Sequence, residues 1–304
     1  MLRFLGNSVV AAAIVVSISA CNGATALAPS GGAFKTALSE PASSTALLHI
    51  EVPDQVIGTG MNGQRPQVLD NLLYHNGLVQ TFPAIGLVYW GFHRPNADPD
   101  NEIPRLDSFL LHLRGSSSLN VPTQYYEIFN GQKVYVPNYP AMSIAVWKDD
   151  VNPLPSPHPI DRDVRAEALR AASYFNFGVP LVDNLIIVAI PHGVPMRYAE
   201  CAYHGTVNGI TYTNLPYQAD FGAPCGAYSV NPGPVGVLDG VTETAIHEIA
   251  ESMTDPHFFG WYDAKGLEIG DKCQQFAKNV VLHGKKFPVQ PLWSNATGDC
   301  RYDD

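Results

Sequence analysis

The sequence predicts an α/β or α+β fold in which helices pack on a mixed sheet. Two short runs of apolar and β-branched residues, at 82–92 and 184–191, have the length and composition of buried strands. Three other segments, at 101–114, 161–176 and 240–254, repeat their apolar residues at helical spacing. Because both kinds of segment are spread along the chain, we expect helices that cover a sheet within one domain.

The composition excludes two classes of protein. The chain has 304 residues, of which 46% are hydrophobic and 15% are charged, so it can form a large core and is not disordered throughout. Its formal net charge is −10, whereas proteins that bind nucleic acid present clusters of Lys and Arg. We therefore expect no nucleic-acid partner.

The first 20 residues have the features of a lipoprotein signal peptide. Arg3 precedes an apolar run over 9–18, and two small residues precede Cys21. This order predicts that residues 1–20 are removed and that Cys21 carries a lipid. The mature protein would then be anchored in a bacterial cell envelope, in the outer membrane, periplasm or cell surface. An ordinary secretory signal with a coincidental cysteine is the alternative, and it predicts a secreted protein.

The segment that follows the predicted signal peptide is a candidate tether. Residues 21–47 are rich in Ala, Ser, Gly and Pro and have no periodicity, which is typical of a flexible linker. From residue 48 the aromatic and β-branched content rises, and no second linker of comparable length follows. We therefore predict a single domain over 48–304.

The remaining cysteines are even in number, which in an exported chain predicts two disulfides. They are Cys201, Cys225, Cys273 and Cys300. Three pairings are possible, and closure of short loops favours the first with the second and the third with the fourth. A zinc site made of cysteines is the weaker alternative, because no Cys-x-x-Cys pair is present.

The predicted helices begin after recognisable start signals. Asn101 precedes the apolar stripe of 101–114 and is a candidate cap, and Asp161 precedes that of 161–176. The third helix, at 240–254, ends before Pro256, and it carries the most informative residues of the chain.

The third helix contains the sequence His-Glu-x-x-Glu. His247 and Glu251 are four residues apart, so they lie on one face of a helix and can bind one cation. Glu248 follows directly, at the position where zinc-peptidase helices place their general base. The arrangement resembles the zincin helix His-Glu-x-x-His with a carboxylate as second ligand, which still binds Zn²⁺ but widens the range of divalent metals. The alternative is a solvated helix face with an ordinary His–Glu pair.

A catalytic zinc site needs a third protein ligand, and the segment after the helix offers three candidates. These are His257, Glu268 and Asp271. His257 has the offset of a metzincin ligand, but the glycine of that motif is missing. We favour Glu268 and Asp271, because a Gly-containing turn and a disulfide at Cys273 would hold them rigidly. Asp263 with Glu268 is an alternative calcium loop, although the spacing differs from an EF-hand.

The remaining histidines have no partner at ligand spacing, and we interpret them as structural or surface residues. Among them are His75, His93, His158, His192 and His204.

Four segments of the chain resemble a known family. YHNGLVQTFPAIGLVYWGF (74–92) resembles the opening of the phosphate-induced (Exordium-like) proteins. AIHEIAESMTDP, GWYDAKGLEIGDKC and VQPLWSNATGDC resemble secreted microbial relatives of that family, which are regarded as candidate zinc-dependent peptidases. The resemblance spans roughly residues 70–301 and implies a zincin-like catalytic helix with His247, Glu248 and Glu251. The plant members generally depart from that motif, so a shared fold does not guarantee catalysis.

The sequence thus predicts a lipid-anchored zinc hydrolase that acts on a protein or peptide. His247 and Glu251, with Asp271 or Glu268, would hold the metal, and Glu248 would take a proton from water. The alternatives are a non-enzymatic envelope module that binds glycan or protein and has a structural metal, and a degenerate zincin that binds no metal.

Overall fold

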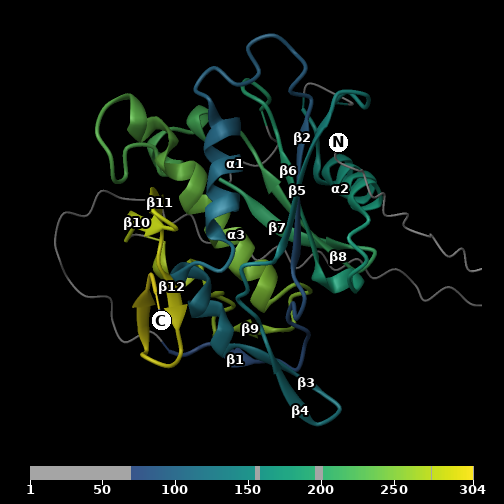
Figure 1. The fold of residues 1–304 in the computed structure, drawn as a ribbon, viewed down its shortest axis with the longest axis vertical. Coiled ribbons are helices and arrows are strands. Elements are labelled where there is room, and N and C mark those ends of the chain that lie inside the picture. Colours follow the sequence, from purple (N-terminus) through teal and green to yellow (C-terminus); the bar gives the residue numbers. More distant parts are fainter. Residues whose placement is uncertain (1–69, 155–157, 196–200, 275, 304) are drawn as a thin grey trace, which may run out of the picture. The chain divides into compact units, whose positions relative to one another are not determined.

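Five strands form the central sheet of the protein. The computed structural model describes residues 70–154, 158–195, 201–274 and 276–303. The strands are β2 (Ala84–Trp90), β5 (Ser143–Asp149), β6 (Asn184–Ala189), β7 (Tyr203–Val207) and β8 (Ile210–Leu215). They lie in the order β5-β2-β6-β8-β7 (Figure 1). The first four in this order are parallel, and β7 pairs antiparallel with β8 at one edge.

The middle of the sheet is buried on both faces. Every residue of β2 and β6 is buried, and neighbouring side chains alternate between two apolar clusters: Leu87 belongs to one and Val88 to the other. Such continuous apolar runs are typical of parallel strands covered on both sides. The strands predicted within 82–92 and 184–191 are confirmed.

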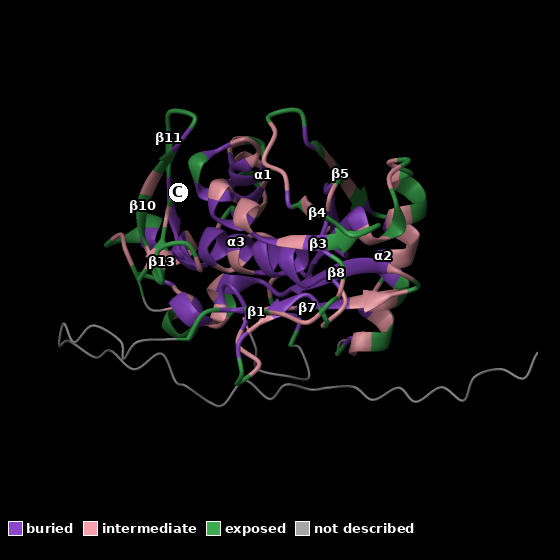
Figure 2. Ribbon diagram, turned by 90° about the horizontal axis from the view of Figure 1, so that it is seen from below, coloured by how far each residue is buried: buried purple, intermediate pink, exposed green. Residues whose placement is uncertain are grey.

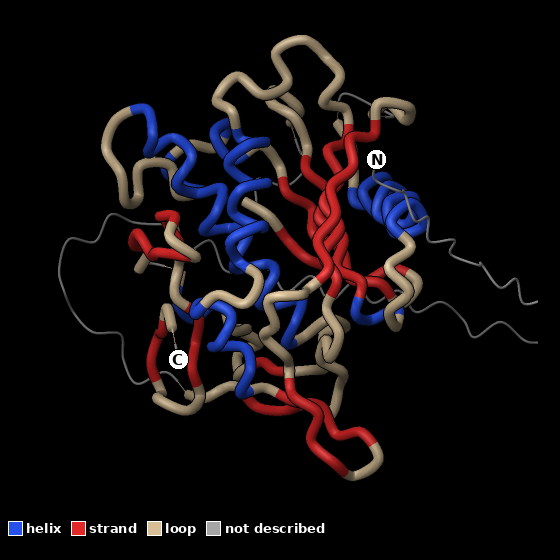
Figure 3. The backbone as a smooth tube through the Cα atoms, viewed as in Figure 1, coloured by secondary structure: helices blue, strands red, loops and turns tan. Residues whose placement is uncertain are grey.

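Three helices cover the two faces of this sheet. Helices α1 (Glu102–Leu113) and α3 (Asp239–Thr254) share the first cluster, and α2 (Asp161–Phe175) packs against the second on the opposite face (Figures 1 and 3). The predicted helices and the mixed α/β fold class are confirmed. Asn101 occupies the N-cap position of α1, as predicted, but it adopts a left-handed conformation and its side chain makes no capping bond. The carboxylate of Asp98 instead accepts from the first N–H groups of α1, on Glu102 and Ile103.

Short antiparallel pairs and single helical turns connect these layers. The strand pairs are β1 (Leu73–Tyr74) with β9 (Trp261–Tyr262), β3 (Tyr126–Phe129) with β4 (Gln132–Tyr135), β10 (Lys278–Leu282) with β11 (Lys285–Val289), and β12 (Leu292–Ser294) with β13 (Asp299–Arg301). The 3₁₀ turns are η1 (Ser117–Gln124), η2 (Leu181–Asp183), η3 (Gln218–Asp220), η4 (Ala223–Cys225), η5 (Pro234–Leu238) and η6 (Asp271–Cys273).

Helix α3 is buried almost all round (Figure 2). Along its length only Thr244 and His247 are less than fully buried. These two residues are three positions apart, so they lie on the same face of the helix. His247 therefore stands on the one stripe of α3 that approaches solvent, and the alternative of a solvated His–Glu face is wrong.

Two disulfides close short loops. Cys201 is bonded to Cys225 and Cys273 to Cys300, which confirms the pairing favoured by loop length. Structural disulfides are typical of the periplasm or the extracellular space.

The predicted signal peptide, the lipidation site Cys21 and the tether over 21–47 lie outside the described residues. Within the part of the chain that the structure describes, no helix has the length and apolar character that a membrane span requires.

Candidate metal centre

The His-Glu-x-x-Glu residues of α3 meet as their spacing predicts. The Nε2 atom of His247 lies 2.9 Å from Oε1 of Glu251, one helical turn away. The side chain of Glu251 is 4% exposed and that of His247 is 12% exposed. The pair therefore has one end in the interior and one end toward solvent.

The loop after α3 brings two more carboxylates to this pair. The Oδ1 atom of Asp271 lies 3.6 Å from Nε2 of His247, and the backbone N–H of Asp271 donates to Oε1 of Glu251 at 3.3 Å. Asp271 in turn accepts from the backbone N–H of Glu268 at 3.0 Å. A carboxylate oxygen of Glu268 lies within 4.8 Å of the donor atoms of Glu251 and His204, so both favoured loop carboxylates lie in the cluster.

Asp263 and His257, the other candidate metal ligands from this region, make contacts elsewhere. Asp263 accepts from the backbone N–H groups of Lys265 and Leu267 and pairs with the buried ammonium of Lys272 at 2.6 Å. It therefore shapes the loop and lies outside the group of donor atoms, so the calcium-loop alternative has no support from the geometry. His257 faces the backbone carbonyl of Gly209 at 3.3 Å and is likewise outside the cluster.

A glutamine orients the histidine of α3. The Oε1 atom of Gln290 lies 3.3 Å from Nδ1 of His247, and the Nε2 group of Gln290 donates to the carbonyl of Gly270 at 2.9 Å. If Nδ1 carries the proton, Nε2 is left with a free lone pair toward Glu251 and Asp271. An acceptor on the distal nitrogen is a common feature of metal-binding histidines.

His204, which the sequence analysis set aside as an isolated residue, lies at the centre of the cluster. Its Nδ1 atom is 3.6 Å from both Glu248 Oε2 and Glu251 Oε2, and its Nε2 atom is 3.8 Å from Glu268 Oε1. The imidazole ring is stacked against Phe258, with 5.0 Å between ring centroids. His204 stands on β7, 43 residues before His247, so ligand spacing could not reveal it. The sequence feature that could have drawn attention to His204 is its position three residues after Cys201, which is held by a disulfide.

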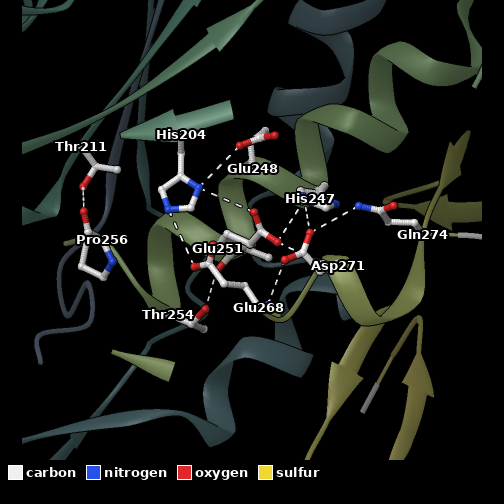
Figure 4. A network of polar contacts seen from close by, with 12 residues as sticks. His204, Thr211, His247, Glu248, Glu251, Thr254, Pro256, Glu268, Asp271 and Gln274 are labelled. Carbon is white, nitrogen blue, oxygen red and sulfur yellow. Dashed lines mark hydrogen bonds and ion pairs between the residues drawn. The ribbon is translucent and has the colours of Figure 1, made fainter. Parts of the chain in front are cut away.

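Two groups of three residues have the geometry to hold a metal ion (Figure 4). His247, Glu251 and Asp271 form one group, and His204, Glu251 and Glu268 form the other; in each, one donor atom per residue lies within 4.8 Å of the others. Glu251 belongs to both groups. Glu248 borders the cluster next to His204.

Three buried polar atoms of this cluster have no hydrogen-bond partner in the part of the chain that the structure describes and could bind a cation. Among the described residues, Nε2 of His204, Oε2 of Glu248 and Oε1 of Glu268 are buried and have no hydrogen-bond partner. A buried polar group without a partner costs about 1–3 kcal/mol, and three of them in one place would be costly. Imidazole and carboxylate together are the donor set of zinc and neighbouring divalent metals. The residues present therefore fit a divalent ion.

The electrostatics of the cluster depend on burial and on close opposite charges. Burial lowers the pKa of His247, but the adjacent Glu251 carboxylate outweighs this and raises the pKa to about 10. Burial raises the pKa of Glu251, and the charge of His247 outweighs it and lowers the pKa to about 2. Burial and the nearby Glu251 raise the pKa of Asp271 to about 6. Without a metal the cluster therefore holds protons that a cation would displace.

Comparison of the chain with protein-family models, with curated proteins and with solved structures finds no match. The resemblance to the Exordium-like proteins stays a prediction, and the function must be argued from the site itself.

Proposed function

We propose that the protein is a metal-dependent hydrolase of the cell envelope that cleaves peptide bonds. The observation that carries the proposal is the group formed by His247, Glu251 and Asp271, which three separate constraints hold together: the helical turn, the loop after α3 and the bond to Gln290. Three protein ligands leave a position for water, as in catalytic zinc sites.

The roles of the residues follow from their positions. A divalent ion on His247, Glu251 and Asp271 would polarise the substrate carbonyl and lower the pKa of water. Glu248 is the general base: it accepts a proton from the water that attacks the carbonyl carbon and delivers it to the amine as the C–N bond breaks. Its Oε2 atom has no hydrogen-bond partner in the described part of the chain, which leaves a lone pair for that proton.

A peptide substrate is supported by the position of the sheet edge. Strand β7 is the edge strand of the sheet as described, and it carries His204 into the cluster. An edge strand can pair with an extended peptide through its free backbone groups. The carbonyl of such a peptide would pass close to the metal centre.

The experiment compares zinc content and peptide hydrolysis in the wild type and in Glu248→Gln. We expect the variant to retain zinc and to lose about 100-fold or more of its activity, because general-base catalysis contributes about 10²–10⁴-fold. Glu243→Gln is the matched control: Glu243 is a buried carboxylate on the same helix that bonds to Ser229 and belongs to neither metal group. Equal activity in the wild type and Glu248→Gln would refute the mechanism.

The second candidate function is a non-catalytic envelope module with a structural metal. The deep burial of His204 and Glu251, each 4% exposed, favours it, because structural sites are closed by protein ligands. Zinc binding in wild type without hydrolysis of any peptide would select this alternative.

Lipid anchoring at Cys21 belongs to the same proposal. When cells that express the protein are lysed and fractionated, the Cys21→Ser variant should move from the membrane pellet to the supernatant. Unchanged membrane association would contradict the anchor.

A further inference from the structure

The deep end of the cluster contains a second group of donors that the proposed hydrolase site does not use. His204 and Glu268 lie behind the shared residue Glu251, and each of them is 8% exposed as a residue. Both have a buried atom that points into the cluster and has no hydrogen-bond partner in the described residues, namely Nε2 of His204 and Oε1 of Glu268. These unsatisfied atoms are evidence separate from the presence of acidic groups.

In this deep group, one donor atom from each of the three residues lies within 4.8 Å of the others. The Nδ1 atom of His204 lies 3.6 Å from Oε2 of Glu251, and its Nε2 atom lies 3.8 Å from Oε1 of Glu268. These distances exceed the 2.7–3.2 Å of ordinary hydrogen bonds. Two atoms that each stand about 2.1 Å from one tetrahedral zinc ion are about 3.4 Å apart. By contrast, the 2.9 Å between His247 and Glu251 is a direct hydrogen-bonding distance.

The two oxygens of Glu251 face different groups. Oε1 faces His247, and Oε2 faces His204, as Figure 4 shows for the side chain between the two rings. A carboxylate in this position can bind one ion through each oxygen, as bridging carboxylates do in two-metal hydrolytic sites.

The charge of the cluster also favours more than one cation. Five acidic residues contribute to it: Glu248, Glu251, Asp255, Glu268 and Asp271. They face only two histidines, while the nearby ammonium of Lys272 is already paired with Asp263. When metal binding has displaced their protons, the five carboxylates carry five negative charges, of which one divalent ion compensates two.

We propose that His204, Glu251 and Glu268 hold a second divalent cation, which the carboxylate of Glu251 bridges to the ion of the outer group. The inference rests on the proposed function for the outer ion, at His247, Glu251 and Asp271. Nε2 of His204, which has no hydrogen-bond partner in the described residues and faces Glu268, binds the inner ion, and Nδ1 faces the carboxylate of Glu248 at 3.6 Å. The inner ion fixes the position of Glu251 and so of the outer ion.

The test is the zinc stoichiometry of the purified protein after removal of all metal by a chelator and reloading with Zn²⁺. We expect about two ions per wild-type chain and about one in His204→Asn, in Glu268→Gln and in Asp271→Asn. Glu251→Gln should hold less than one, and the control Glu243→Gln should hold two. Near-ultraviolet circular dichroism of each variant shows whether its fold is kept.

Anomalous diffraction at the zinc edge gives a readout that needs no variant. Two adjacent peaks in wild-type crystals support the inference, and a single peak overturns it. One ion per wild-type chain that remains bound in His204→Asn also overturns it. The proposed hydrolase function would survive that result if Glu248→Gln still abolished peptide cleavage, so the two failures are distinguishable.

Discussion

The Cα atom of Gly270 packs against the imidazole ring of His247, so that a Cβ atom on Gly270 would lie 2.7 Å from both Cγ and Nδ1 of the ring. The backbone of Gly270 is in the ordinary helical region, with φ of −81°. The glycine is therefore required by this contact and not by its backbone conformation. The loop that carries Asp271 can approach α3 only because residue 270 has no side chain.

Gly270→Ala should therefore displace the ring of His247 or the loop. We expect a loss of about 1–3 kcal/mol of stability and about a tenfold or greater fall in zinc affinity, measured by urea unfolding and competition with a chelator. Gly284→Ala is the control, because Gly284 lies in open space with φ of +86°. It should lose stability through backbone strain and keep the zinc affinity of wild type. Unchanged zinc affinity in Gly270→Ala would contradict the packing argument.

Gln290→Leu tests whether the glutamine fixes the tautomer of His247. Leu keeps the approximate size of the side chain but removes both the acceptor for Nδ1 and the donor to Gly270. We expect zinc affinity to fall by about 10–100-fold, measured by calorimetric titration. Gln80→Leu is the matched control, since Gln80 is fully buried and donates to Val182 instead. Equal zinc affinities in the two variants would refute a positioning role for Gln290.

The local part of the site could be predicted from the sequence, and the non-local part could not. The spacing of His247 and Glu251 is a property of one helix, and Asp271 follows in a short loop, so periodicity and turn signals predicted them. His204 and Gln290 reach the cluster through pairing at the sheet edge and through the segment between β11 and β12. Such contacts depend on how strands pair across the whole domain, which the residues around them do not encode.

The same distinction between local and non-local contacts explains which elements of the fold were predicted. Continuous apolar runs predicted β2 and β6, which are buried on both faces. Strand β7 was not predicted. It stands at an edge, and its sequence YHGTV mixes polar and apolar residues because it carries a site residue. The side chain that caps α1 was not predicted, because Asp98 reaches the helix from three residues before the N-cap residue Asn101, across a turn.

The Cys273–Cys300 disulfide should hold the metal-binding loop in place. Cys273 lies two residues after Asp271, and its disulfide closes a loop with a sequence separation of 27. Cys273→Ala/Cys300→Ala should lose about 3 kcal/mol of stability and weaken zinc binding at the outer group, which contains Asp271. Thermal unfolding and zinc titration measure the two effects. A stability loss without any change in zinc affinity would show that the disulfide stabilises the domain but does not position the ligand.

Removal of metal should lower the melting temperature. A ligand present at about 1,000 times its Kd stabilises the folded state by about 4 kcal/mol, and that stabilisation disappears when a chelator removes the ion. Differential scanning calorimetry with and without chelator measures the shift. Glu251→Gln, which removes the residue common to both donor groups, should show little chelator effect. Identical melting temperatures of the wild type in zinc and in chelator would contradict metal binding.

Glu167, on the opposite face of the sheet from α3, should make stability depend on pH. Its side chain is 0% exposed and bonds to Arg170 at 2.9 Å. Burial raises its pKa to about 7, and the neighbouring Asp149 adds to the rise. Between about pH 4.5 and pH 7 the folded state therefore keeps a proton that the unfolded chain has released. In that window stability falls as the pH rises.

Glu167→Gln keeps the shape of the protonated side chain and removes its titration. The difference in unfolding free energy between wild type and variant should shift by about 2–3 kcal/mol, in favour of the variant, from about pH 4.5 to about pH 8. Urea unfolding at several pH values measures it. Asp150→Asn, at an exposed carboxylate one residue after Asp149, should follow the wild-type curve. Because Glu167 lies on α2, whose apolar residues pack in a different cluster from those of α3, its pH effect should persist in metal-free protein. A wild-type-minus-variant difference that is constant with pH would show that Glu167 is charged in the folded state, stabilised by Arg170.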